Sequence, residues 1–236
     1  MKSTNLSQTA AWVDVRELLE QHHALHVHYR RDELICQAGT YAAGIHLVVS
    51  GIVQESYSEP ENGFGDAVLL LGGPGQLIGT ELLLPDPEDL HRTTFRAVSD
   101  VRLCFLEQSA FHRALETSDL LWRFLLGCLS KTGFERARAQ WRCDLPGRER
   151  LTLLLLDLSP LAGSPQSDGE TTLPQEVDLR TLAGLLRLSA RQTRRLCAEL
   201  PDVRWSQGCL SFFPERLAEQ LTEPSAPSHE LRSGRS

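Results

Sequence analysis

The chain contains 236 residues, of which 41% are hydrophobic and 23% charged, and its formal net charge is −7. This composition is that of a globular protein and excludes a wholly disordered, collagen-like or purely coiled-coil chain. Apolar runs such as residues 153–156 are far shorter than the ~20 residues of a membrane helix, and residues 1–15 lack the apolar block of a secretory signal, so we expect a cytoplasmic protein.

The N-terminal half predicts a helix followed by a β-rich domain. Apolar residues recur at helical spacing from Trp12 to Leu19, so residues 12–23 should form a helix. Between residues 25 and 106, short β-rich runs alternate with glycine and proline, which is typical of a β-sandwich or barrel. The predicted strands are residues 34–36, 45–49, 52–57, 67–71, 77–78, 94–98 and 101–106.

Two helices are predicted after these strands. Ser109 is placed to cap a short helix ending at Leu115, and Ser118 or Asp119 to cap a long helix over residues 120–142. One small barrel is too short to cover the apolar stripe of the long helix, so we expect that stripe to pack against a partner helix in a homodimer. The predicted dimer contacts are Leu121, Leu125, Cys128, Leu129 and Thr132.

The sequence Leu145-Pro146-Gly147 ends the helical pattern and marks a domain boundary. A helix over residues 148–158 and a loop over residues 159–175 should follow, and the segment after Thr222 has the composition of a disordered tail. The predicted parts are a β-domain with its N-terminal helix (1–116), a dimerisation helix (117–144), a C-terminal domain (145–222) and the tail (223–236).

Residues 178–200 have the pattern of a helix-turn-helix. Two apolar stripes flank a turn at Leu188, Ser189 is placed to cap the second helix, and Ala183 is small enough for the helices to cross closely. Residues 203–213 predict two strands around Gly208, which completes a winged helix-turn-helix. The alternative is a helical hairpin with packing duties only, and the arginines on its outer face disfavour it.

The charge distribution indicates that this segment binds DNA. Residues 180–216 hold seven arginines against three acidic residues in a chain that is acidic overall, and nucleic acid requires a local cationic face. A recognition helix places its N-terminal residues on base edges in the major groove. The predicted contacts are Arg191 and Arg194 or Arg195 to bases, and Ser189, Gln192 and Thr181 mainly to phosphates, with Ala190 and Arg187 beside them.

Six cysteines stand at positions 36, 104, 128, 143, 197 and 209, and none forms a Cys-x-x-Cys pair. This spacing argues against a zinc ribbon or a thioredoxin-type motif. We expect reduced thiols, most of them small buried apolar side chains. A redox or iron–sulfur role stays open, because ligands distant in sequence can converge in a fold.

The ordered set of motifs resembles the CRP/FNR (cyclic-AMP receptor protein/FNR) superfamily of bacterial transcription regulators over about residues 20–216. Its carriers are Leu34-Ile-Cys-Gln-Ala-Gly39, His46-Leu-Val-Val-Ser-Gly51, Gln76-Leu-Ile-Gly79, Arg92-Thr93-Thr94, the long helix from Asp119, Leu145-Pro-Gly-Arg148 and the winged motif. The resemblance implies an α+β protein with a double-stranded β-helix (β-roll) sensor of the cyclic nucleotide-binding type. It also implies a homodimer on inverted-repeat double-stranded DNA, with RNA polymerase as a partner and without enzymatic activity.

The resemblance places an effector pocket at Gly79, Thr80, Glu81, Arg92, Thr93, Glu135 and Arg136. Thr80 stands where cyclic-nucleotide binders have Glu, and Arg92-Thr93 lies two residues further along than the family's phosphate-binding Arg-Ser. Glu135 and Arg136 replace hydroxyls that meet the purine, and a carboxylate beside a buried anion is costly unless it is paired. We therefore expect gating by a small-molecule or redox signal other than cyclic AMP, of unknown identity.

The recognition helix and the N-terminus also depart from the family's pattern. Arg195 matches the family's Arg, whereas Arg191 replaces a usual Glu, and a reversed charge should change the operator sequence. Arg187 stands at a turn position often held by Gly, which a non-Gly residue tolerates poorly if φ is positive. The N-terminal cysteine cluster of FNR-type proteins is absent, because no cysteine precedes Cys36.

Histidines crowd the start of the barrel, and His26-x-His28 with Glu33 resembles the first metal motif of cupins, which are metal-dependent enzymes. Residues 73–79 lack the His of a second cupin motif, so this enzyme is a remote alternative. We favour a polar surface at the helix-to-barrel junction, with a haem or iron–sulfur gas sensor of the same family as the alternative. No metal site is predicted, and the weak candidate ligands are His22, His26, His28, Cys36, Cys104, Cys128 and Cys143.

Overall fold

The computed structural model describes residues 4–58, 66–83 and 89–222. Helix α1 (Thr4–Gln21) leads into two four-stranded antiparallel sheets. In the first sheet the order is β1 (Leu25–Tyr29), β8 (Val101–Glu107), β3 (Gly44–Ser50) and β6 (Leu77–Ile78). In the second it is β2 (Leu34–Cys36), β7 (Thr94–Ala97), β4 (Val53–Ser58) and β5 (Asp66–Gly72). The predicted β-rich domain is therefore a sandwich of two sheets.

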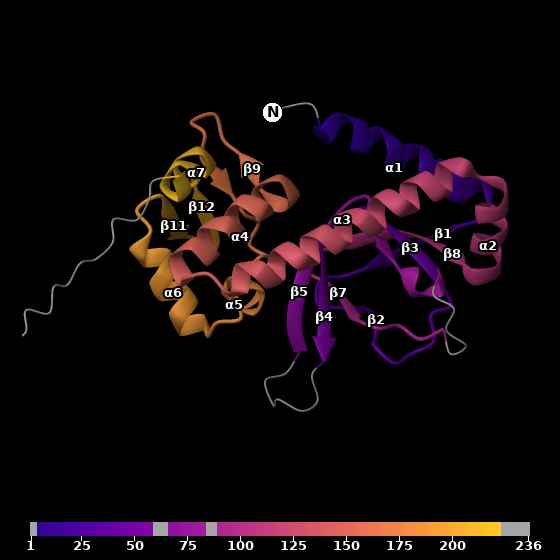
Figure 1. Cartoon of the computed structure of the whole chain (residues 1–236), viewed down its shortest axis with the longest axis horizontal. Coiled ribbons are helices and arrows are strands. Elements are labelled where there is room, and N and C mark those ends of the chain that lie inside the picture. Colours follow the sequence, from indigo (N-terminus) through magenta and orange to yellow (C-terminus); the bar gives the residue numbers. More distant parts are fainter. Residues whose placement is uncertain (1–3, 59–65, 84–88, 223–236) are drawn as a thin grey trace, which may run out of the picture.

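The alternation of side chains along the strands builds two apolar layers. Val48, Val53 and Leu103 are fully buried in the cluster between the sheets. On the outer face of the first sheet, Ile45 and Leu47 pack in a second cluster with residues of α1 and of the helices that follow the barrel. The barrel is thus covered on one side by helices (Figure 1).

Strand β1 was not among the predicted strands. It is an edge strand that pairs only with β8, from Leu25 opposite Phe105 to Tyr29 opposite Val101. His26 and His28 are exposed on it, so its pattern lacks the apolar run that marks a buried strand.

Helices α2 (Gln108–Thr117) and α3 (Asp119–Cys143) match the two predicted helices, with one correction at a cap. Glu107, not Ser109, caps α2, and its carboxylate accepts a hydrogen bond from the Ser109 backbone N–H at 3.2 Å. With the cap at Glu107, the helix begins two residues earlier than a cap at Ser109 implies. Ser118 caps α3 by accepting from the Leu121 N–H at 3.2 Å.

The predicted break at Leu145-Pro146-Gly147 lies between α3 and α4 (Gly147–Ala162). The remaining elements are β9 (Ser164–Pro165), β10 (Thr171–Thr172), α5 (Leu179–Leu186), α6 (Ala190–Glu199), β11 (Val203–Ser206), β12 (Cys209–Phe212) and α7 (Pro214–Thr222). The prediction of a plain loop over residues 159–175 was wrong, because α4 is longer and β10 pairs with β12 in the sheet β11-β12-β10-β9. The tail predicted at 223–236 lies outside the described residues.

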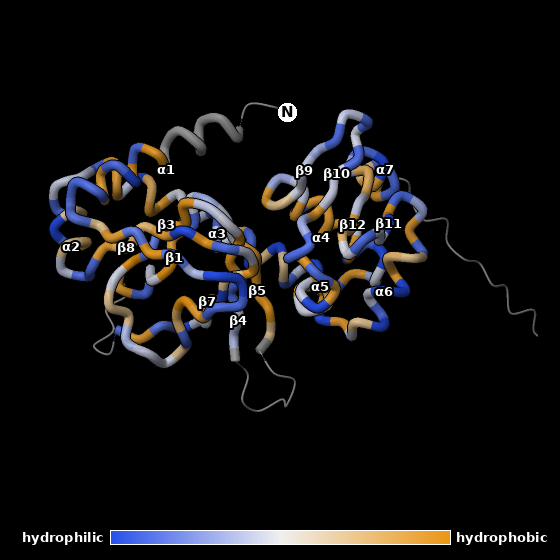
Figure 2. The backbone as a smooth tube through the Cα atoms, turned by 180° about the vertical axis from the view of Figure 1, so that it is seen from behind, coloured by the Kyte–Doolittle hydropathy of each residue, from blue (hydrophilic) through white to orange (hydrophobic). Residues whose placement is uncertain are grey.

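The elements from α4 to α7 form a C-terminal unit, which we call the head. The head packs directly against the barrel. Ile52, Leu71 and Val98 of the barrel belong to the same apolar cluster as the head. Gly184 permits this approach, because a Cβ there would lie 2.6 Å from the Val68 Cγ2 of β5. Figure 2 shows hydrophobic β5 on the side of the barrel that faces α5. No helix among the described residues is long and apolar enough to cross a membrane.

Candidate nucleic-acid interface and barrel pocket

The helix-turn-helix is built by local hydrogen bonds. Asp178 caps α5 by accepting from the Thr181 N–H at 2.8 Å. Ser189 and Gln192 form a capping box at the start of α6, in which the Gln192 N–H donates to Ser189 Oγ at 3.2 Å and the Ser189 N–H donates to Gln192 Oε1 at 3.0 Å. These bonds use Ser189 and part of Gln192, so only their remaining donors are left for a phosphate.

The turn between the helices contains a strained residue. Arg187 caps α5 in the left-handed conformation, with φ 51° and ψ 45°, at the position where the family pattern often has Gly. A left-handed non-glycine residue costs roughly 1–2 kcal/mol. The guanidinium at this position is exposed, so the turn adds a positive charge beside α6.

Helix α6 has a buried face and a cationic face. Thr193, Leu196 and Cys197 are buried, which fixes the opposite face outward. The predicted contacts on that outward face are all exposed, and they are Ala190, Arg191, Gln192, Arg194 and Arg195. Arg195 Nε lies 3.4 Å from the Glu199 carboxylate one turn later. Within the described part of the chain, no ion pair holds Arg191 or Arg194 to the protein, so both guanidinium groups face solvent.

The wing lies beside the N-termini of α5 and α6. Gln207 and Gly208 both have positive φ, 51° and 82°, as a two-residue hairpin turn requires. A cleft of about 540 Å³ separates the wing from the two helices. Its lining includes Arg180, Ala190 and Trp205, so the cleft places a cation and an aromatic ring beside the start of the recognition helix.

The link between α3 and the head is polar and densely bonded. Asp157 of α4 forms ion pairs with Arg138 at 2.8 Å and with the buried Arg142 at 2.5 Å. Arg150 of α4 donates to the carbonyls of Leu145 and Leu186, each at 3.0 Å, and also to that of Cys143. These contacts join the end of α3, the linker and the end of α5.

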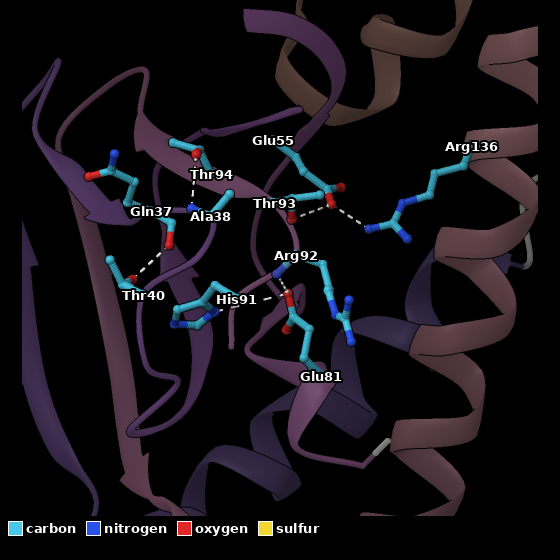
Figure 3. Close-up of polar contacts among 10 residues, drawn as sticks. All are labelled: Gln37, Ala38, Thr40, Glu55, Glu81, His91, Arg92, Thr93, Thr94 and Arg136. Carbon is cyan, nitrogen blue, oxygen red and sulfur yellow. Dashed lines mark hydrogen bonds and ion pairs between the residues drawn. The ribbon is translucent and has the colours of Figure 1, made fainter. Parts of the chain in front are cut away.

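The predicted effector pocket contains a carboxylate that sequence reasoning missed. Glu55 of β4 is 1% exposed. Its Oε1 accepts a hydrogen bond from Thr93 Oγ1 at 2.9 Å and forms an ion pair with Arg136 of α3 (Figure 3). The signal was present as an acidic residue inside a predicted strand, next to the buried position Val53. Thr93 and Arg136 are therefore brought together, with Glu55 between them.

The other predicted pocket residues lie around this pair or away from it. The Arg92 backbone N–H donates to Glu81 Oε1 at 3.2 Å, and His91 Nδ1 is 4.0 Å from the same oxygen. Gly79 has φ +89° ahead of the short helix η1 (Thr80–Leu83), and a Cβ there would meet the Gly44 carbonyl at 2.5 Å. Glu135 lies 3.8 Å from Lys131 on its own helix.

A second cavity, of about 320 Å³, opens elsewhere on the barrel. Its lining includes Tyr29, Cys36, His46, His91 and Phe105. Burial lowers the pKa of His46 to about 4 and the neighbouring His91 adds to that shift. Burial also lowers the pKa of His91. Two neutral imidazoles therefore line this cavity.

The predicted dimer stripe on α3 needs correction. Leu121 and Leu125 are fully buried in the cluster beneath α1, and Cys128 packs against that cluster. Leu121 and Leu125 cannot reach a partner, because their side chains are fully buried within the fold of their own chain. The apolar side chains exposed on α3 are Leu120, Trp122, Leu126, Leu129, Phe134 and Trp141. Only Leu129 is shared with the predicted apolar contacts, and Thr132 is half-buried.

The candidate metal ligands are spread over separate elements. His26 and His28 are exposed on β1, and His26 Nε2 lies 3.3 Å from Glu20. Cys36 and Cys104 are buried, and Cys128 and Cys143 are half-buried. Among the described residues, no group of three or more His, Cys, Asp or Glu side chains is arranged to hold a metal ion.

The structure combines a barrel domain, a long helix and a winged helix-turn-helix in this order. Residues 26–118 match the family model of the cyclic nucleotide-binding domain. Solved structures match over most of the chain's length, which gives the chain the fold of the CRP/FNR family. No match was found among curated proteins.

Three solved structures illustrate the likeness. A CRP/FNR-family transcriptional regulator from Thermus thermophilus has 21% identity and a TM-score of 0.67, covering 83% of this chain and 97% of its own. FixK2 from Bradyrhizobium japonicum has 20% identity and a TM-score of 0.69, covering 86% and 99%. The c-di-GMP-responsive global regulator CLP of Xanthomonas campestris has 20% identity and a TM-score of 0.71, covering 86% and 99%.

Proposed function

We propose that this protein is a homodimeric, sequence-specific DNA-binding regulator of transcription and not an enzyme. The observation that carries the proposal is the outward cationic face of α6, on which Arg191 and Arg194 have no ionic partner within the described residues. Guanidinium groups on the outward face of such a helix can donate two hydrogen bonds to guanine O6 and N7, which are acceptors in the major groove.

The surroundings of α6 support contacts to the phosphate backbone. Arg187 in the turn, Arg180 on α5 and Arg204 on the wing are all exposed. They lie on the same part of the head as the N-termini of α5 and α6, whose free N–H groups also attract phosphates. Arg195 would exchange its exposed Glu199 partner for DNA at little cost, because such surface pairs contribute below about 1 kcal/mol.

Dimerisation is proposed through the exposed side of α3. Trp122, Leu126, Leu129 and Gly133 recur at steps of four, three and four residues, so they form one stripe. No atom lies within 4 Å of a Cβ built at Gly133, so a second helix can approach closely there. Paired α3 helices would set two reading heads on half-sites about one DNA turn, or ~34 Å, apart.

The test is selection of bound duplexes from a random DNA pool, followed by mobility shifts and sedimentation. We expect an inverted repeat, binding that weakens steeply with salt, and a dimer on one site. Recovery of no consensus from the pool, together with equal affinity for all duplexes, would contradict the proposal. Transcription with purified RNA polymerase on the selected operator then tests the proposed partnership with the polymerase.

We further propose gating by a small molecule other than cyclic AMP. Burial raises the pKa of Cys36 to about 12 and that of Cys104 to about 11, which disfavours the reactive thiolate form of these two cysteines. The cavity lined by His46 and Tyr29 offers room for a small ligand. Screening metabolites by thermal shift, with operator affinity as the second readout, tests this; equal operator affinity with every metabolite and oxidant would favour a constitutive binder.

A further inference from the structure

Glu55 places a carboxylate inside the barrel, facing α3. The side chain is 1% exposed, and its partner Arg136 is half-exposed on α3. Its Oε1 takes both available donors, the Thr93 hydroxyl and the Arg136 guanidinium (Figure 3). Its Oε2 is buried without a hydrogen-bond partner among the described residues.

These contacts make the ion pair necessary to the barrel. A buried carboxylate without a counter-ion is strongly unfavourable, so Arg136 compensates a charge that the fold has already enclosed. Glu55 and Arg136 are 81 residues apart in sequence, so the ion pair ties strand β4 to the long helix.

The same contacts determine which ligands the site can bind. An anion entering here would have to displace Glu55 from Thr93 and Arg136 while lying against its negative charge. Glu81 adds a second carboxylate to the cluster, next to the Arg92 backbone. Neither of the two cavities described above is lined by Glu55 or Arg136.

We propose that Glu55 is the resident anion of this barrel: it occupies Arg136 and Thr93 in place of a ligand, holds α3 to β4, and excludes anionic ligands, cyclic nucleotides and phosphate among them. Glu55 is then the residue that decides ligand class at this site. The inference concerns the barrel alone and does not depend on DNA binding.

The first test measures binding of cyclic AMP, cyclic GMP and inorganic phosphate by calorimetry, without DNA. We expect no saturable binding to the unaltered protein up to ~1 mM, and an affinity at least tenfold higher for Glu55→Val, which frees Arg136 and Thr93. Glu135→Gln on the same helix as Arg136 is the matched control and should gain nothing. Micromolar binding of a cyclic nucleotide to the unaltered protein, or no gain in a folded Glu55→Val, overturns the proposal.

The second test covers the case in which Glu55→Val does not fold. Glu55→Gln, Arg136→Gln and the double variant are compared by urea unfolding, since Gln preserves the side-chain size at position 55. We expect the coupling between Glu55 and Arg136 in this double-mutant cycle to change the unfolding equilibrium constant by about tenfold. The exposed pair Lys131–Glu135, 3.8 Å apart on α3, is the control and should show about twofold or less. Coupling no larger than in this control overturns the proposal.

Discussion

The guanidinium of Arg150 donates to the carbonyl of Leu186, the last residue of α5, at 3.0 Å. The same side chain also donates to the carbonyl of Cys143, the last residue of α3, and to that of Leu145 in the linker. One residue of α4 therefore holds the end of the long helix α3 and the first helix of the reading motif in a common frame.

We predict that Arg150→Met destabilises the head by about 2 kcal/mol, because carbonyls that lose a charged donor are left without a partner. Unfolding in urea, followed by tryptophan fluorescence, measures the change. Arg148→Met, at an exposed position on the same helix, serves as the control and should stay within about 0.5 kcal/mol. Equal effects of the two substitutions would show that the Arg150 contacts contribute nothing.

Asp157→Asn should cost about 2 kcal/mol of stability, because it leaves a buried cation without its carboxylate, and removing one partner of a buried pair is more costly than the pair is worth. That cation is Arg142, which is 4% exposed. The comparison is with Asp144→Asn, an exposed carboxylate at the end of α3. A midpoint shift in urea no larger than that of Asp144→Asn would rule out a structural role for the Asp157 pairs.

Arg191→Ala is expected to weaken operator binding by roughly 1–3 kcal/mol and to relax preference at one base pair per half-site. We place Arg187 on a phosphate. Arg187→Ala should therefore weaken binding to all DNA sequences alike and should reduce the slope of log affinity against log salt concentration by about one per head. Competition mobility shifts on operator variants distinguish the two. Arg113→Ala on exposed α2 is the control, and an Arg191→Ala protein with unchanged base preference would remove this residue from the reading surface.

Leu126→Glu should convert the dimer into a monomer, because it places a carboxylate in the exposed stripe of α3, where Leu126 is 59% exposed. Sedimentation equilibrium gives the answer directly. Leu25→Glu introduces the same charge at another exposed leucine, on β1 (62%), and should leave the oligomeric state unchanged. A dimer that survives Leu126→Glu would place the interface elsewhere.

Acid should destabilise the barrel through His46. Burial lowers its pKa to about 4, below the 6.5 of an unfolded histidine. The unfolded chain therefore binds the proton more readily, so this contribution is complete above pH 6.5 and is lost as the pH falls toward 4. The loss amounts to about 3 kcal/mol. His46→Phe, which retains packing on Phe105, should show a shallower decline between pH 6.5 and 4, whereas His112→Gln at an exposed site should not.

Much of the reading motif was predictable because its determinants are local. Ser189 and Gln192 are three residues apart, as are Asp178 and Thr181, and such capping pairs are visible in the sequence. The position of the turn at Arg187, between the two helices, followed from the spacing of these capping residues. The barrel strands were predictable from alternation and glycines, except for β1, whose exposed edge position removes the apolar signal.

The pocket and the interface were less predictable, because their contacts join distant parts of the chain. The predicted stripe on α3 is divided between two environments: Leu121 and Leu125 are fully buried within the fold of the same chain, whereas Leu129 is exposed. Helical periodicity gives the angle between such residues but not which angle faces the barrel.

The sequence by itself determined the Ser118 cap of α3, the Ser189 cap of α6 and the arginines of α6, since each depends on residues within a few positions of one another. Only the tertiary structure decided that Glu55 meets Arg136, 81 residues away, and that Arg150 reaches Leu186, 36 residues away. Such contacts arise when packing brings strands and helices together, and side-chain pairing over that separation leaves no periodic signal in the chain.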